Sequence, residues 1–441
     1  MSRSRSWTAL LCVYTATLLL AGSVRAQELS GNLALLGQVR DGDQTRRTEV
    51  PVDLYSNLSV TGLRHGTRFD SFARLEQDFG IDQGASDFYE GALRVPGAIP
   101  GIDMTVGRQF LSEGPTGVYV ADAGKVRIDR GWPVSFTLFG GAPRYFEPTY
   151  STNIISQEEA IWGGSVRVAQ WKSTQLSLGY FGQAREDHVL RHLVTSTASR
   201  VFTELPGVPR FYGSMAYDVD HWNFDEGTGG FDVFWTPRLK FNVEGTYYKP
   251  QDHEHTVPNS NLNRREDALF EVFAASALTQ WRAGISHTLT ATLSHFVDYS
   301  FQHYDHIEST QIENSHIASS GLVWLPGGDG LETVRVQYYV ISSDAGNVNG
   351  GKISYQSRVY QDLWLRSMFD ATGYDKERNQ SGTALSGLLG VGFVILPGLT
   401  SEVNFEGIHN NRFAEEFRFG FFITYNFRHS LKRGEQKGAA S

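Results

Sequence analysis

Residues 413–427 read Phe-Ala-Glu-Glu-Phe-Arg-Phe-Gly-Phe-Phe-Ile-Thr-Tyr-Asn-Phe. Apolar side chains occupy every second position of this stretch, at Phe417, Phe419, Phe421, Ile423, Tyr425 and Phe427. Charged and polar residues hold positions between them, at Glu416, Arg418, Thr424 and Asn426. Successive residues of a strand point to opposite faces. The stretch therefore predicts a β-strand with one aromatic face and one polar face.

The same alternation recurs along most of the chain, for example in residues 50–61, 67–79, 124–129, 240–247 and 333–340. A soluble barrel cannot bury so many ions at its centre. Segments of about 10 residues with an apolar and a polar face are typical of barrels in lipid. Such a barrel must close, because an open edge leaves backbone groups unpaired in hydrocarbon. The sequence predicts an all-β, transmembrane, antiparallel up-and-down β-barrel.

The connections between the predicted strands alternate between short and long. Short ones often carry Trp or Pro, as in residues 130–133, 235–238, 324–328 and 396–399. Long polar ones are residues 142–158, 187–228, 249–265, 303–315 and 343–381. Short periplasmic turns opposite long extracellular loops are expected of outer-membrane barrels, and Trp at the turns fits an interfacial aromatic girdle.

The parity of the alternation gives about 18 strands, within a range of 16 to 20. Residues 211–224 and 353–370 are ambiguous, since each could contain a further pair of strands, or residues 352–368 could form a loop helix. We find no internal repeat and no interdomain linker. The predicted barrel spans residues 27–428, and residues 429–441 form a polar periplasmic tail.

The N-terminus has the features of a cleaved signal peptide. Arg3 and Arg5 precede an apolar stretch, residues 10–22, which is too short to span a bilayer as a helix. Val24-Arg25-Ala26 then places suitable residues at a cleavage site, which predicts a mature chain from Gln27 and export through the inner membrane to the outer membrane.

Composition excludes several classes of protein. The single cysteine, Cys12, lies inside the predicted signal peptide, so the mature chain has no disulfide, no iron–sulfur cluster and no C-x-x-C-H haem site. The full chain has a net charge of −9, and the mature chain −12, because 36 basic and 48 acidic residues remain without Arg3, Arg5 and Arg25. An acidic chain argues against nucleic acid as a partner, because phosphate binding needs basic surface.

Two stretches resemble a known family. The alternating aromatic segment that ends at Phe427 is similar to the terminal strand signal read by the outer-membrane assembly machinery. Thr105-Val106-Gly107-Arg108-Gln109 resembles a strand segment found in Gram-negative porins. The chain thus resembles porin-like outer-membrane β-barrels, which implies a diffusion channel. Arg108 shares its parity with Val106 and Phe110, so we expect it to face outward at the rim.

The inward-facing charges are the candidate site residues. The pore-lining candidates are Arg68, Asp70, Arg74, Glu76, Lys125, Arg127, Arg167, Arg185, Glu244, Glu271, Arg335 and Glu402. Further inward charges are Asp78, Glu90, Arg94, Asp103, Asp129, Lys240, Asp298 and Glu406. Acid and base are nearly balanced in the first half of the chain and acid is in excess in the second. A lumen this wide keeps such ions hydrated.

Catalytic and metal chemistry are not expected. Asp252-His253-Glu254-His255 and His303-Tyr304-Asp305-His306 bring possible metal ligands together, but both fall in or beside predicted polar loops. No G-x-S-x-G or other nucleophile motif occurs. We predict no enzyme activity, no metal and no cofactor.

The predicted function is an outer-membrane porin whose water-filled pore passes ions and small hydrophilic solutes, with at most a mild preference for cations. The alternative is a barrel sheath around a periplasmic electron-transfer partner such as a multihaem cytochrome, or a substrate-specific transporter. Expected partners are outer-membrane lipid, the assembly machinery, small solutes, and either a second copy or a periplasmic protein.

Overall fold

The structure is a computed structural model that describes residues 28–41, 48–80, 83–112, 119–144, 159–171, 173–185, 188–248, 277–305, 314–328, 330–344, 346–375, 381–410 and 415–430. The predicted signal peptide and nearly all of the predicted tail lie outside these residues. No helix within the described ranges is both long and apolar enough to cross a membrane.

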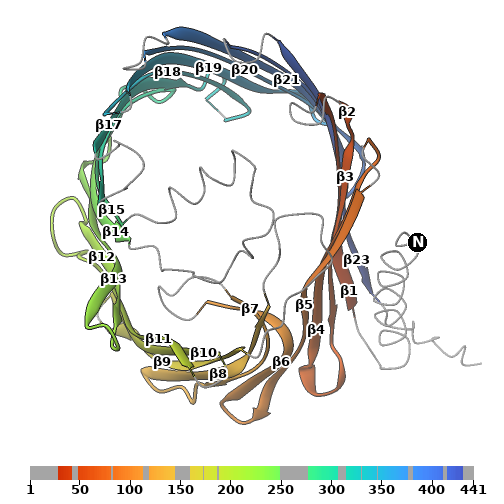
Figure 1. Ribbon diagram of the computed structural model, residues 1–441, viewed down its shortest axis with the longest axis vertical. Coiled ribbons are helices and arrows are strands. Elements are labelled where there is room, and N and C mark those ends of the chain that lie inside the picture. The colour runs from red at the N-terminus through yellow and green to blue at the C-terminus, as the bar shows by residue number, and fades with distance from the viewer. Residues whose placement is uncertain are drawn as a thin grey trace, which may run out of the picture.

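The described residues form one antiparallel sheet (Figure 1). Its strands are β1 (Glu28–Asp41), β2 (Thr48–Glu49), β3 (Pro51–Thr61), β4 (Arg68–Asp78), β5 (Gln83–Ile99), β6 (Ile102–Leu111), β7 (Tyr119–Ile128), β8 (Val134–Arg144), β9 (Glu159–Trp171), β10 (Thr174–Arg185), β11 (His188–Val201), β12 (Arg210–Asp218), β13 (Asn223–Thr236), β14 (Leu239–Tyr248), β15 (Ala277–Thr288), β16 (Leu293–Asp305), β17 (Asn314–Trp324), β18 (Glu332–Ser343), β19 (Gly346–Tyr360), β20 (Leu363–Asp375), β21 (Gly382–Leu396), β22 (Leu399–Asn410) and β23 (Glu416–Ser430). A single 3₁₀ turn, η1 (Arg64–Gly66), joins β3 to β4.

The sheet closes on itself. β1 pairs with β23 from Glu28 opposite Ser430 to Arg40 opposite Arg418, and on its other side β1 pairs with β3. Figure 1 shows the resulting ring, with the first and last strands adjacent. The prediction of a closed, antiparallel up-and-down β-barrel is confirmed.

The predicted strand number was wrong. The short β2 pairs only with β1 and continues toward β3, so the two count as one wall strand and the barrel has 22 strands, not about 18. The additional strands fall in two ranges that were predicted as long loops: β11 and β12 occupy much of 187–228, and β19 and β20 occupy much of 343–381. These two ranges are not long loops, and residues 352–368 are not a helix.

The missed strands have small or polar residues on both faces. β11 contains Thr-Ser-Thr-Ala-Ser, and β19 begins Gly-Asn-Val-Asn-Gly-Gly. Alternation of hydrophobicity is the primary strand signal in a sequence, and it disappears when both faces carry residues of similar polarity.

The two rims of the barrel differ in their connections. The rim where β1 begins and β23 ends, here called the terminal rim, includes connections as short as residues 361–362 between β19 and β20 and 397–398 between β21 and β22. The opposite rim has long connections at 145–158 and 249–276, and also short ones at 186–187 and 344–345. The strict alternation of short and long predicted from the sequence is therefore broken.

Candidate functional site

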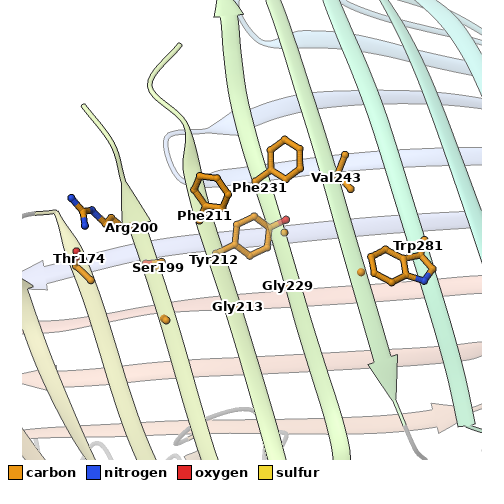
Figure 2. Close-up of a pocket in the computed structure, with 13 residues that line it drawn as sticks. Thr174, Ser199, Arg200, Phe211, Tyr212, Gly213, Gly229, Phe231, Val243 and Trp281 are labelled. Atoms are coloured by element: carbon orange, nitrogen blue, oxygen red, sulfur yellow. The ribbon is translucent and has the colours of Figure 1, made fainter. Parts of the chain in front are cut away.

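The two faces of the wall differ in chemistry. Phe211, Phe231 and Trp281 lie on the near side of the wall in Figure 2, with the far wall of the barrel behind them, so they face outward. Register partners on neighbouring strands point to the same face, so the outer face can be followed from strand to strand around the ring. Exposed side chains on this face include Val336, Leu389 and Phe419. The opposite parity faces the lumen and carries most of the ionisable side chains, and this inner face is the candidate functional site.

An acidic network lies on the inner face of β3, β4 and β5. The guanidinium of Arg74 is 2.8 Å from Asp53, 2.7 Å from Glu76 and 3.7 Å from Asp87. Because one cation is shared among three carboxylates, this part of the inner face has an excess of negative charge. Tyr55 lies beside it, with the Arg74 Cζ 5.8 Å from its ring centre.

A second network continues it toward the terminal rim. Asp70 accepts from Arg68 at 2.6 Å and lies 2.9 Å from Arg94, and Arg94 reaches Glu90 at 2.7 Å. The register sets this geometry, because Arg68 is directly opposite Arg94 and the two cations need an anion between them. These pairs alternate in sign and leave no net local charge.

The other predicted pore-lining residues are distributed around the ring. Arg127 lies 3.2 Å from Asp129, and Arg185 is bound to Glu159. The carboxylate of Glu244 accepts from the Tyr212 hydroxyl at 2.7 Å, and Arg366 lies 2.6 Å from Glu402.

Three more candidates differ in their surroundings, and one falls outside the described residues. Lys125 and Arg167 share the inner-face parity of β7 and β9, and Arg167 is exposed. Arg335 places its Cζ 4.5 Å above the ring of Phe296. Glu271 is not among the described residues.

An apolar group on the inner face was not predicted. Leu111, Ala121, Ala123, Phe139, Ile161, Phe181, Leu193 and Ala216, with Tyr119 packed on them, form this inner apolar cluster. It extends from β6 to β12, although β7 pairs only with β6 and β8. The ends of β6 to β8 at the rim opposite the terminal rim therefore curl into the lumen. Figure 1 shows β7 inside the ring near β9 and β10.

A buried ion pair holds this curl. Arg191 on β11 donates to Asp225 on β13 at 2.6 Å and to the Tyr119 hydroxyl on β7 at 2.9 Å. The Tyr119 ring also stacks on Phe181, with centroids 4.9 Å apart. Asp225 stands at the bulge where the β12–β13 register shifts. No sequence signal identified this contact, because it joins strands that are not neighbours in the ring.

Arg108 has the same parity on β6 as Val106 and Phe110. The Phe110 ring on this face lies 6.5 Å from the ring of Phe72, which is on the inner face of β4. The outward orientation of Arg108 at the rim stays a prediction. Its guanidinium makes two hydrogen bonds to Asp122, at 2.7 and 3.1 Å, and one to the Phe88 carbonyl at 3.1 Å. Arg144 binds the same carboxylate at 2.7 Å. This cluster stands behind the curl of β6 to β8, on the opposite side of the sheet from the inner apolar cluster.

No group of three or more His, Cys, Asp or Glu side chains within the described ranges is arranged to hold a metal ion. Residues 252–255 and His306, which entered the metal hypothesis, fall outside those ranges.

The described residues thus form a closed antiparallel barrel with an apolar outer face and an ion-rich inner face, the arrangement expected of a barrel in lipid. No family model and no curated protein matches the chain. Among solved structures, Pseudomonas aeruginosa OccK3 (OpdO) is similar at 12% identity over 91% of this chain and 96% of that chain, with a TM-score of 0.45. P. aeruginosa OccK2 (OpdF), solved in complex with glucuronate, is 10% identical over 93% and 99% of the two chains, with a TM-score of 0.46. P. aeruginosa OpdK, solved with vanillate, is 10% identical over 91% and 99%, with a TM-score of 0.46.

Proposed function

We propose that this protein is an outer-membrane porin that conducts ions and small hydrophilic solutes by passive diffusion. The observation that carries the proposal is the inner face itself. Charged and hydroxyl side chains line the inner face of successive strands. Such groups are stable there only in contact with water or with each other. The wall has no open edge between β1 and β23, as a barrel in hydrocarbon requires.

The acidic network around Arg74 gives the pore a mild preference for cations. Rings or patches of carboxylates attract cations into a channel. At physiological ionic strength their field reaches about 8 Å, and at 1 M salt about 3 Å. The preference therefore weakens as salt rises. Charge pairs elsewhere on the inner face, such as Arg366 with Glu402, keep the preference small.

The curl of β6 to β8 favours a solute pore over a sheath. It brings Leu111 and Tyr119 onto the inner side of β10 and β11 and so occupies part of the lumen. A sheath around a folded cytochrome would need that space. A barrel of 22 strands is nevertheless wider than the predicted one, so the sheath stays as the second candidate.

The topology also suggests an orientation. We propose that the signal peptide is cleaved after Ala26 and that the terminal rim, where both chain ends lie, faces the periplasm. Trp132, Trp235 and Trp324 are exposed at this rim, where aromatic side chains mark the membrane interface.

Purified protein in planar bilayers under a KCl gradient tests the proposal, because the reversal potential reports ion preference directly. We expect open channels with a small potential of the sign for cations. Asp53→Asn combined with Asp87→Asn should move the potential toward anions, as should Glu244→Gln. Glu332→Gln is the matched control, because Glu332 has the outer-face parity of β18. A purified barrel without conductance, which conducts or transfers electrons only beside a partner, would favour the sheath.

A further inference from the structure

A groove crosses the outer face of β12, β13 and β14 (Figure 2). Gly213, Gly229 and Gly245 are register partners on these three strands, so a row of the wall has no side chains. The cavity above this row has a volume of about 580 Å³. A Cβ added at Gly229 would meet nothing within 4 Å, which shows that the floor of the groove is open.

Aromatic side chains form the walls. Phe211 and Phe231 stand together at one side, with ring centroids 5.9 Å apart. The Trp281 ring lies over Gly245, since a Cβ there would be 2.7 Å from the indole. The walls are apolar, and in a bilayer no water is available to fill the space between them. An unfilled groove would lack the dispersion contacts that its walls make when occupied.

A cation stands at the terminal-rim end of the groove. Arg200 is the next-to-last residue of β11, and its Cζ lies 4.3 Å above the Phe202 ring. Its Nη2 is 3.3 Å from Glu204, but its Nε is buried and donates no hydrogen bond within the described part of the chain. The Arg200 side chain is 42% exposed and lines the apolar groove, so its positive charge is accessible there.

We propose that this groove binds one anionic glycerophospholipid, with an acyl chain along the glycine row and the headgroup phosphate at Arg200. The proposal rests on the proposed function, because it requires the outer face to lie in a membrane. A flexible chain fits a narrow apolar channel, and an anionic headgroup complements the guanidinium at the level of the interface. A second barrel would present a convex wall and leave the groove empty.

Native mass spectrometry of the full barrel in detergent with phosphatidylglycerol tests the acyl-chain site. A Cβ at Gly229 meets nothing within 4 Å, so Gly229→Leu should place its side chain in the groove. The peak with one bound lipid should then be lost while the barrel stays folded. Gly387→Leu is the matched control, because Gly387 has the same outer-face parity on β21 and its Cβ would meet only a carbonyl 4.0 Å away. Equal lipid retention in the two variants would overturn the proposal.

Arg200→Gln tests the headgroup contact. The preference for phosphatidylglycerol over phosphatidylcholine should fall about fivefold, the effect expected of one basic residue at a lipid surface. Arg238→Gln, at an exposed position in the terminal-rim turn between β13 and β14, should leave the preference unchanged. An unchanged preference in Arg200→Gln, or a lipid-free dimer that Gly229→Leu abolishes, would refute the lipid site.

Conductance separates this proposal from the proposed function. Gly229→Leu should conduct like the wild type, because the groove is on the far side of the wall from the lumen. A wild-type barrel that binds lipid but does not conduct would contradict the proposed porin function and would still support the lipid site.

Discussion

Arg191 and Asp225 form an ion pair inside a barrel whose other inner charges are mostly more exposed. Their side chains are 11% and 9% exposed, against 48% and 44% for Arg127 and Asp129 in their pair. Breaking a buried pair from one side leaves an unpaired charge without solvent, whereas breaking an exposed pair leaves a hydrated one. The two kinds of pair therefore contribute very differently to stability.

We predict that Arg191→Met destabilises the barrel by about 3–5 kcal/mol, because Asp225 is left unpaired. Urea-dependent unfolding, followed by gel mobility without heating, measures the change. Adding Asp225→Asn should recover part of the loss, since the unpaired charge is then removed. The control Arg127→Met, which leaves the exposed Asp129, should cost about 1 kcal/mol or less. Equal losses in the two single variants would mean that Arg191 is hydrated.

Strand β23 shows how two faces of one element tolerate the same change differently. Phe421 faces outward and lies on Gly37 of β1, where an added Cβ would come within 2.2 Å of its ring. The next residue, Phe422, is opposite Glu402 and has the inner-face parity. One step along the strand thus moves a side chain from lipid to lumen.

Phe421→Arg should therefore destabilise the barrel by about 2–4 kcal/mol, the cost of a cation on the lipid face near the midplane. Phe422→Arg, the matched control, should cost much less, because its guanidinium would lie near Glu402 in the lumen. Folding into liposomes over a urea series measures both values. A reversed order would show that the two faces have been exchanged.

The curl of β6 to β8 depends on glycine at close contacts. A Cβ at Gly163 would lie 2.4 Å from the Tyr180 carbonyl and 2.7 Å from the Phe139 ring. A Cβ at Gly141 would lie 2.3 Å from the Asp122 carbonyl. Side chains at these positions would force the strands away from the inner apolar cluster.

We expect Gly163→Leu to displace the curl, which should raise single-channel conductance and lower the yield of folded barrel. Gly124→Leu on β7 is the control, since a Cβ there would meet nothing within 4 Å. Single-channel recordings of both variants give the comparison. An unchanged conductance in Gly163→Leu would indicate that the curl does not narrow the pore.

At the scale of the whole molecule, the closed barrel predicts where and in what form the protein is found. It should fractionate with the outer membrane, give a β-type circular dichroism spectrum, and migrate differently on SDS gels with and without boiling. Intact mass should place the mature N-terminus at Gln27. A soluble periplasmic protein with the same mass would contradict the membrane assignment while leaving signal cleavage intact.

The sequence by itself determined the class of fold and the face on which each strong strand residue lies. The segment ending at Phe427 shows why. Successive side chains of a strand point to opposite faces, so apolar residues at every second position indicate that one face is in contact with lipid. The inner-face parity of Arg74, Lys125 and Glu402 follows from the same rule.

Only the tertiary structure decided the number of strands, the curl and the groove. β11 and β19 carry little contrast between their faces, and they are strands because neighbours on both sides satisfy their backbone groups. The contact of Tyr119 with Arg191 and the alignment of Gly213, Gly229 and Gly245 depend on register between different strands. Register is a property of pairs of strands, so no single stretch of sequence contains it.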